Sequence, residues 1–297
     1  MSSPAVGIVG LGNMGGRIAS RIDGGGERLI GYDADGARAA ERGIEAAASL
    51  ADLVDAVDVV LLSLPDSTVV EAVVRGEAGI LSSCRQGQIV VDLGTSSPVS
   101  TRELAAELAA RGVEMLDAGI SGGAAAAEKG TLTIMVGGDG GALDRVRPLL
   151  ATFSERVFHM GVVGSGHTTK LLNNFLNAVT LAATAEVMVA AQIAELDLRQ
   201  VLEVINSSSG VSFASLNRFP RIVEGDYLEG GLTSALMLKD VTLYLDMLHE
   251  LGAPSLNVAG PMASFGLALG LGYGDVISNR VVDAIGDVAG GVRVSAG

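Results

Sequence analysis

One lysine and three asparagines open a long helical segment that otherwise has little use for polar side chains. They lie in the stretch GSGHTTKLLNNFLN (164–177). In a helix Lys170, Asn174 and Asn177 fall at positions i, i+4 and i+7 and share one face. Asn173 lies at the margin of that face. Because buried amides without partners are costly, this polar stripe must face water, a partner or a cavity.

The lysine itself indicates acid–base chemistry. Of the 20 basic residues, 17 are arginines, and the lysines are Lys129, Lys170 and Lys239. Arginine keeps its proton near neutral pH. A lysine that is desolvated, near a second cation such as Lys239, or at a helix N-terminus can release it. A lysine tuned in this way suits general acid–base catalysis.

Two other interpretations of this segment stay open. A lysine at a helix end often extends its ammonium group into solvent and has no chemical role. His167, one turn before Lys170, is a rival acid–base group, but we expect it to be an exposed residue of the first helical turn.

A glycine-rich turn near the start of the chain predicts a dinucleotide-binding site. Gly10, Gly12 and Gly15 form the pattern GxGxxG directly after an apolar strand and at the start of a helix. The first glycine permits a tight turn, the second lets a pyrophosphate approach the backbone, and the third allows close packing of helix on strand. Asp33 ends the next predicted strand, 21 residues past Gly12, where a carboxylate can accept hydrogen bonds from the adenosine ribose.

The same aspartate indicates which dinucleotide binds. Its charge would repel a 2′-phosphate, and no arginine immediately follows Asp33, so NAD is favoured over NADP. The alternative is that Asp33 only caps the turn in the segment DADG (33–36).

The first half of the chain alternates short apolar, β-branched runs with Ala-rich amphipathic segments. This alternation is typical of an α/β domain with a parallel sheet covered by helices on both faces. After residues 157–161 the pattern becomes helical, so we expect a Rossmann-type domain at 1–163 and an all-helical domain at 164–297. The runs expected to be strands are 5–10, 28–33, 58–65, 88–94, 114–119 and 131–138.

Composition and charge exclude several classes of function. The formal net charge of −14 argues against a nucleic-acid-binding or anionic-membrane surface. The single cysteine, Cys84, fits a reducing compartment, and MSSPAVGIVG (1–10) shows no signal peptide, so we expect a cytoplasmic protein. No His/Cys cluster has the spacing of metal ligands, so no metal is expected.

Two long uncharged runs, 171–185 and 251–274, are interpreted as buried helices of a soluble protein and not as membrane spans. Asparagines interrupt the first run, and prolines and glycines break the second. Together the apolar segments carry more hydrophobic surface than a helical domain of about 130 residues readily hides. We therefore expect a homodimer or homotetramer formed through that domain.

Taken together, these motifs resemble the β-hydroxyacid dehydrogenase family, which includes 3-hydroxyisobutyrate dehydrogenase and tartronate semialdehyde reductase. The resemblance covers nearly the whole chain, and several motifs in the same order are far more specific than any one alone. The matching segments are GIVGLGNMGGRIA (7–19), SLPDSTVVEAVV (63–74), DLGTSSP (92–98), DAGISGGAAAAEKGTLTIMVGG (117–138), GSGHTTKLLNN (164–174) and LMLKD (236–240).

The resemblance implies a role for three residues of the helical domain. Lys170 would be the acid–base catalyst, Asn174 would orient the substrate, and Lys239 would contact the cofactor. Without the family, Lys239 could equally form a surface ion pair with Asp240.

The remaining implied contacts belong to the N-terminal domain. Ser121, Gly122 and Gly123 would hold the substrate carboxylate, which suits backbone N–H groups left accessible by glycine. Without the family this loop is an ordinary turn with Ser121 as a helix N-cap. The implied cofactor contacts are Gly10, Leu11, Gly12, Asn13, Met14, Asp33, Leu64, Pro65 and Thr95.

The implied activity is reversible, NAD-dependent hydride transfer between nicotinamide and a short β-hydroxy acid, as in 3-hydroxyisobutyrate dehydrogenase. A tartronate semialdehyde reductase, or a related hydroxy-acid or sulfonate dehydrogenase, is the alternative within this chemistry. A non-catalytic NAD-binding module is the alternative from another class. The chain departs from the family around SSSGVSFAS (207–215), where relatives commonly have Arg and Trp, and at Leu232, where they commonly have Phe. Because these positions would line the substrate pocket, the tail of the acid stays open.

Overall fold

The computed structural model describes residues 5–26 and 28–295, and the chain divides into two compact units, Met1–Lys170 and Leu171–Gly297. The division falls inside helix α9 (Ser165–Ile193), which begins two positions after the last residue of the predicted first domain. The predicted domain boundary and the boundary between the two compact units therefore differ only in whether the first turns of α9 are counted with the first unit. Residues 1–4 of the segment expected to lack a signal peptide lie outside the described residues.

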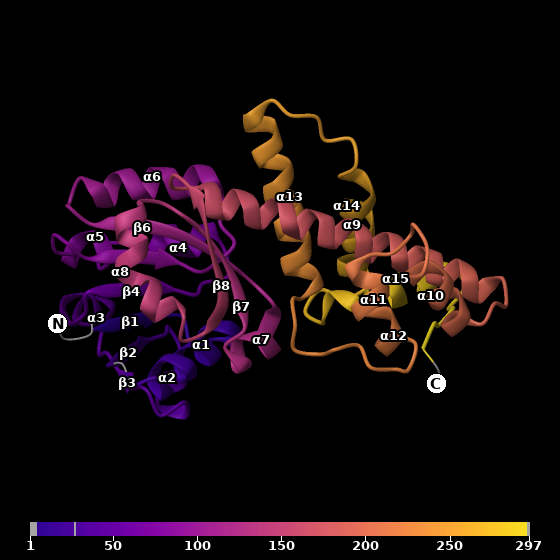
Figure 1. Ribbon diagram of the computed structural model, residues 1–297, viewed down its shortest axis with the longest axis horizontal. Coiled ribbons are helices and arrows are strands. Elements are labelled where there is room, and N and C mark those ends of the chain that lie inside the picture. The colour runs from indigo at the N-terminus through magenta and orange to yellow at the C-terminus, as the bar shows by residue number, and fades with distance from the viewer. Residues whose placement is uncertain (1–4, 27, 296–297) are drawn as a thin grey trace. The chain divides into compact units, whose positions relative to one another are not determined.

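The first unit is built on one eight-stranded sheet in the order β3-β2-β1-β4-β5-β6-β7-β8 (Figure 1). All neighbouring strands run parallel except β6 and β7, which are antiparallel. The strands are β1 (Val6–Val9), β2 (Leu29–Tyr32), β3 (Glu45–Ala46), β4 (Val59–Leu62), β5 (Ile89–Asp92), β6 (Glu114–Ser121), β7 (Leu132–Gly137) and β8 (Ser154–Gly161).

Alternate strand residues enter two hydrophobic cores, one on each face of the sheet. In β4, Val59 and Leu61 belong to one core, and Val60 and Leu62 belong to the other. This division follows from the period of two in a β-strand, and it confirms the expected α/β domain with both faces covered. The first core is completed by side chains of α1 (Asn13–Gly24), the short α2 (Ala37–Glu41), through Ala39, α7 (Gly123–Lys129) and α8 (Gly140–Leu150). The second core is completed by side chains of α3 (Leu50–Ala56), α4 (Ser67–Arg75), α5 (Ile80–Ser83) and α6 (Pro98–Ala109).

The sheet departs from the expectation in two places. The edge strands β3 and β8 were not among the predicted runs, because most of their residues are exposed and they lack a continuous apolar pattern. The antiparallel pairing of β6 and β7 follows from the short connection between Ser121 and Leu132, since a parallel crossover needs a dozen or more residues.

The second unit is helical in the part that the structure describes, apart from one isolated bridge between Thr233 and Ile277. By length and composition α9 could cross a membrane. One side of the helix is buried, since Leu181, Ala185 and Met188 lie in the core of this unit, whereas Leu176 and Val187 are exposed. The other helices are α10 (Leu198–Asn206), α11 (Phe213–Asn217), α12 (Phe219–Ile222), α13 (Ser234–Leu251), α14 (Ala259–Gly270), the 3₁₀ turn η1 (Ser278–Arg280) and α15 (Val281–Val288).

Candidate active site

The glycine-rich turn joins β1 to α1 and leaves the backbone open where a dinucleotide would approach. Gly10 has φ +93°, and a Cβ added there would lie 2.3 Å from the backbone oxygen of Ser63, so only glycine fits. A Cβ at Gly15 would lie 2.0 Å from the carbonyl oxygen of Gly10. At Gly12 the nearest group is the Arg38 guanidinium at 3.4 Å, so this position is accessible to a ligand. No side chain caps the N-terminus of α1, so the turn fits the pyrophosphate of NAD.

The other residues of this motif have different surroundings. Leu11 is fully buried in the core of the first face, and Met14 packs partly against the same core. Asn13 is the exposed first residue of α1, and its carbonyl oxygen accepts a hydrogen bond from Nη1 of Arg17 at 2.6 Å. The side chain of Leu11 therefore has a structural role, and the backbone carbonyl oxygen of this residue accepts a hydrogen bond from Nε of Arg42 at 3.2 Å.

Asp33 follows β2, and its carboxylate is fixed beside the glycine-rich turn. Its Oδ2 accepts a hydrogen bond from the N–H of Leu11 at 2.7 Å, and its Oδ1 accepts one from the N–H of Asp35 at 2.9 Å. The second bond is the turn cap proposed as the alternative role, but the first ties the carboxylate to the turn itself. Nη1 of Arg38 lies 3.5 Å from Oδ2 of Asp33. The sequence prediction considered only the residues immediately after Asp33 and therefore did not include this arginine.

The carboxyl ends of parallel strands collect the predicted residues at one edge of the sheet. Strands β1, β2, β4, β5 and β6 are parallel neighbours, so their carboxyl ends share that edge, where ligands of open α/β sheets bind. Leu64 packs partly against the second core, the neighbouring Pro65 is exposed, and Thr95 is half-buried. The residues that follow or end these strands are Gly10, Asp33, Leu64, Pro65, Thr95 and Ser121.

The loop 121–123 closes β6 and begins α7. Gly122 and Gly123 have φ of +126° and +70°, values that L side chains rarely adopt. Gly122 is the N-cap residue of α7 and no side chain caps this helix, so Ser121 is not the N-cap that the alternative interpretation required. Both glycines are exposed, and their backbone N–H groups can serve an anion.

Lys170 lies against β6 in the first unit. A Cβ added at Gly119 would lie 2.7 Å from Cβ and 3.0 Å from Cγ of Lys170, so the absence of a side chain at Gly119 makes room for the lysine stem. Gly119 and Ser121 point to the same side of the strand because side chains alternate along it. Lys170 is half-buried, and it approaches the strand that ends in the predicted carboxylate-binding loop.

Asp117, two residues before Gly119, holds the start of α9. Its Oδ1 accepts a hydrogen bond from the N–H of Gly164 and its Oδ2 accepts one from the N–H of His167, each at 2.7 Å. The carboxylate is fully buried and satisfies N–H groups that a helix N-terminus otherwise leaves unpaired. The absence of a side chain at Gly166 allows the start of α9 to lie close to the sheet, because a Cβ at this position would lie 2.5 Å from the carbonyl oxygens of Asp117 and Met135.

The expectation that His167 is exposed is wrong. The residue is fully buried, because the first turn of α9 packs against the sheet instead of facing solvent. Its Nδ1 lies 2.8 Å from Oγ1 of Thr101, which itself donates a hydrogen bond to the carbonyl oxygen of Ser97 at 2.9 Å. The imidazole Nδ1 is therefore the protonated donor. Its Nε2 lies 3.7 Å from Oδ2 of Asp92, which is also fully buried. Because neither side chain is exposed to solvent, His167 has a role in packing α9 against the first unit's core.

In the second unit, Asn174 is held by a buried carboxylate. Nδ2 of Asn174 donates a hydrogen bond to Oδ2 of Asp240 at 2.6 Å, and the other oxygen of Asp240 lies 3.1 Å from Nζ of Lys239. The ion pair considered as an alternative for Lys239 exists, but Asp240 is only 2% exposed, so the pair is not a surface feature. Asp240 therefore connects two predicted site residues, Asn174 and Lys239.

Asp117 and Asp240 lie within the family-like motifs of the sequence, but no role in the site was predicted for either residue. Each lies among apolar residues, in EMLDAG (114–119) and LMLKDV (236–241), and a carboxylate within such a run was the available signal.

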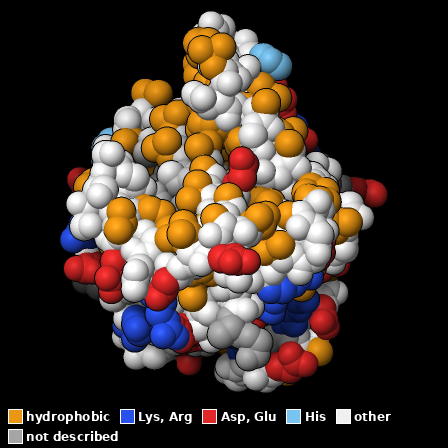
Figure 2. Space-filling view, turned by 90° about the vertical axis from the view of Figure 1, so that its right-hand side faces the viewer, with side chains coloured by type: hydrophobic (Ala, Val, Ile, Leu, Met, Phe, Trp, Pro, Cys, Tyr) orange, Lys and Arg blue, Asp and Glu red, His pale blue; other side chains and the backbone are white. Residues whose placement is uncertain are grey.

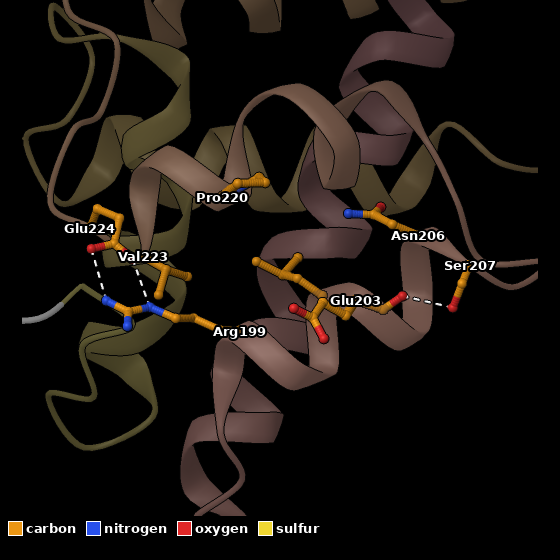
Figure 3. Close-up of a pocket in the computed structure, with 8 residues that line it drawn as sticks. Arg199, Glu203, Asn206, Ser207, Pro220, Val223 and Glu224 are labelled. Carbon is orange, nitrogen blue, oxygen red and sulfur yellow. Dashed lines mark hydrogen bonds and ion pairs between the residues drawn. The ribbon is translucent and has the colours of Figure 1, made fainter.

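A groove elsewhere in the second unit contains none of the predicted site residues. It has a volume of about 520 Å³ and is lined by residues of α10, α12 and their flanking loops (Figure 3). On its rim Arg199 pairs with Glu224 at 2.7 Å. Among the described residues, no group of three His, Cys, Asp or Glu side chains could hold a metal ion.

Two family models together match most of the chain. The model described as the NAD binding domain of 6-phosphogluconate dehydrogenase matches residues 5–161. The model described as NAD-binding of NADP-dependent 3-hydroxyisobutyrate dehydrogenase matches residues 164–277.

Full-length relatives and structures agree with these models. The chain is 32% identical to 2-(hydroxymethyl)glutarate dehydrogenase of Eubacterium barkeri over 98% of both chains. It is 37% identical to NAD-dependent L-serine dehydrogenase of Pseudomonas aeruginosa, over 89% of this chain and 90% of that one. Among solved structures, 3-hydroxyisobutyrate dehydrogenase of Mycobacterium tuberculosis with L-serine aligns with a TM-score of 0.84 and 28% identity, covering 95% of this chain and 98% of that chain.

Proposed function

Because the chain belongs to the β-hydroxyacid dehydrogenase family, and is an NAD-dependent enzyme acting on the CH–OH group of a hydroxy acid, we propose that Lys170 is its acid–base catalyst. The observation that carries this proposal is the contact between the Lys170 stem and Gly119. It puts the lysine on the same strand face as Ser121, which begins the loop proposed to hold the substrate carboxylate.

Each step of the reaction is assigned to a small number of residues of this chain. When bound, NAD supplies the nicotinamide carbon that accepts the hydride. In oxidation, neutral Nζ of Lys170 takes the proton of the substrate hydroxyl, and in reduction its ammonium group returns a proton to the carbonyl oxygen. Asn174, one helical turn later, keeps a second N–H on Nδ2 for a substrate oxygen while the first is held by Asp240. The backbone N–H groups of the loop 121–123 bind the carboxylate and fix the reacting carbon.

We propose NAD contacts at the carboxyl edge of the sheet, together with Lys239 from the helical unit. The contacts in the first unit are the open backbone at Gly12, the N-terminus of α1, the carboxylate of Asp33, and the turns after β4 and β5. The substrate class is a short β-hydroxy acid. The names of the full-length relatives support it and favour neither the tartronate semialdehyde alternative nor a non-catalytic module.

Replacing Lys170 with alanine tests the proposal. We expect kcat/KM for NAD-linked oxidation of 3-hydroxyisobutyrate, L-serine or 2-(hydroxymethyl)glutarate to fall by about 10²- to 10⁴-fold, because the general base is lost. The Kd for NADH, followed by fluorescence, should stay unchanged. Lys129→Ala, which removes an exposed lysine, is the matched control. Wild-type turnover in Lys170→Ala would remove the lysine from the mechanism.

We also propose a soluble cytoplasmic homo-oligomer. Apolar side chains are spread over the face shown in Figure 2, and the exposed apolar residues of the second unit include Leu176, Phe213, Leu251 and Leu256. Extended exposed apolar surface commonly marks a protein interface. A monomeric mass by light scattering would contradict the oligomer, and recovery in a membrane fraction would contradict the location.

A further inference from the structure

Arg218 differs from the other arginines of the second unit in the groups that surround it. Of the five arginines after position 170, four form ion pairs with carboxylates: Arg199 with Glu224, Arg221 with Asp226, Arg280 with Asp283, and Arg293 with Asp287. Within the described residues Arg218 takes part in no ion pair, and its hydrogen-bond partners are two neutral amides.

Those amides fix the guanidinium in place. Nη1 of Arg218 donates to Oδ1 of Asn279 and Nη2 donates to Oδ1 of Asn177, each at 2.9 Å. Asn279 is buried and anchored in turn, since its Nδ2 donates to the carbonyl oxygen of Tyr227 at 2.8 Å. The guanidinium also lies 5.7 Å from the ring centroid of Phe213. Two of its five N–H donors are used in these hydrogen bonds to amides.

The amides orient the charge but do not neutralise it. Burial lowers the pKa of the Arg218 guanidinium to about 10, so it stays cationic at neutral pH. A partly buried cation without an anion is costly. A planar guanidinium held in a fixed orientation has the geometry to bind a carboxylate through parallel hydrogen bonds.

The position of Arg218 along α9 suggests which anion it meets. Asn177 follows Asn174 by three residues, about 4.5 Å along the helix axis, and the two share the polar stripe of α9. A substrate bound at Asn174 would therefore bring a tail of a few carbons within reach of the guanidinium. We propose that Arg218 binds a second carboxylate on the tail of the hydroxy acid, so that the preferred substrate is a β-hydroxy dicarboxylate.

This inference rests on the proposed function, and a matched pair of substrates tests it. 2-(Hydroxymethyl)glutarate carries a distal carboxylate, whereas 2-(hydroxymethyl)pentanoate has a methyl group in its place. We expect the wild type to oxidise the dicarboxylate with kcat/KM at least about tenfold higher. Arg218→Gln should lower kcat/KM for the dicarboxylate by about 10- to 100-fold and change the value for the pentanoate by less than about threefold.

Two further variants complete the design. Arg218→Lys should recover part of the preference, since it keeps the charge but not the planar donor geometry. Arg221→Gln, which breaks an ion pair three residues away, should leave the preference unchanged and serves as the control for folding and melting temperature.

Three outcomes would overturn the inference: equal loss for both substrates in Arg218→Gln, a rise in KM for NAD alone, or no dicarboxylate preference in the wild type. The first would assign Arg218 to packing and the second to cofactor binding. In each case Lys170-dependent turnover of the pentanoate would leave the proposed function standing. Turnover that does not depend on Lys170 would refute the proposed function.

Discussion

Replacing Asp117 with asparagine removes the negative charge that holds the first turn of α9 against β6, while keeping the shape of the side chain. An asparagine can accept only through its single amide oxygen, so one of the two N–H donors, at Gly164 or His167, would face an NH₂ group. A hydrogen bond to a charged acceptor contributes about 1.5–3 kcal/mol, and a buried N–H left unpaired costs about 1–3 kcal/mol. The loss in stability should therefore be about 2.5–6 kcal/mol, which lowers the melting temperature by roughly 5–20 °C.

The Asp117→Asn substitution should also lower the rate of catalysis, because it disturbs the position of Lys170. Asp117 fixes the helical turn that precedes Lys170, so weakening its hydrogen bonds allows Nζ of the lysine to move away from its position. A small misplacement of a reacting group can lower the reaction rate by about 10²-fold. We expect kcat to fall by about 10- to 100-fold in steady-state assays run well below the melting temperature, with the Kd for NADH unchanged.

Asp139→Asn is the matched control, because Asp139 caps α8 through the N–H of Ala142 at 2.9 Å and lies elsewhere in the unit. Asparagine and aspartate are similar N-caps, so this variant should stay within about 0.5 kcal/mol of the wild type with full activity. If Asp117→Asn is equally stable, the energetic role of the buried carboxylate is refuted. If it melts early but turns over normally below its melting temperature, Asp117 does not position Lys170.

Two further substitutions examine the lysine stem and the cofactor. Gly119→Ala puts a methyl group 2.7 Å from Cβ of Lys170, so we expect displacement of the lysine and a 10- to 100-fold lower kcat, with NADH affinity retained; wild-type kcat would contradict the contact. Asp33→Ser removes the carboxylate proposed to exclude a 2′-phosphate and leaves Arg38 nearby, so kcat/KM should fall about tenfold for NAD and rise for NADP. An unchanged ratio of the two kcat/KM values would count against the role of Asp33.

The features that the sequence predicted well depend on local patterns. The buried strands at 5–10 and 88–94 are continuous apolar runs, and the position of Asp33 beside the glycine-rich turn follows from a spacing within one βαβ unit. Neither needs knowledge of distant contacts. The edge strand β8 carries no such pattern, since most of its residues meet solvent. The antiparallel turn of β7 depends on the length of a connection and was not foreseen.

The polar residues that sequence reasoning missed are buried by partners far along the chain. His167 is covered by a contact with Thr101, 66 residues away, and Asp117 binds the N–H groups of Gly164 and His167 across 47 and 50 residues. A helical period cannot reveal such contacts, because burial of a first turn depends on the sheet against which it packs.

Strand β6 carries Asp117, Gly119 and Ser121 in alternate positions on one side. A one-residue insertion before Asp117 would turn all three side-chain positions to the other face of the strand. It would abolish the anchoring of α9, the space for the Lys170 stem and the proposed anchoring of the acid at once. Arg218, by contrast, lies in the turn between α11 and α12, in the second unit, and its substitution leaves that strand unchanged. If these residues have the roles proposed above, a change at position 218 alters the accepted tail of the acid while Lys170 and the residues of β6 that support it stay the same.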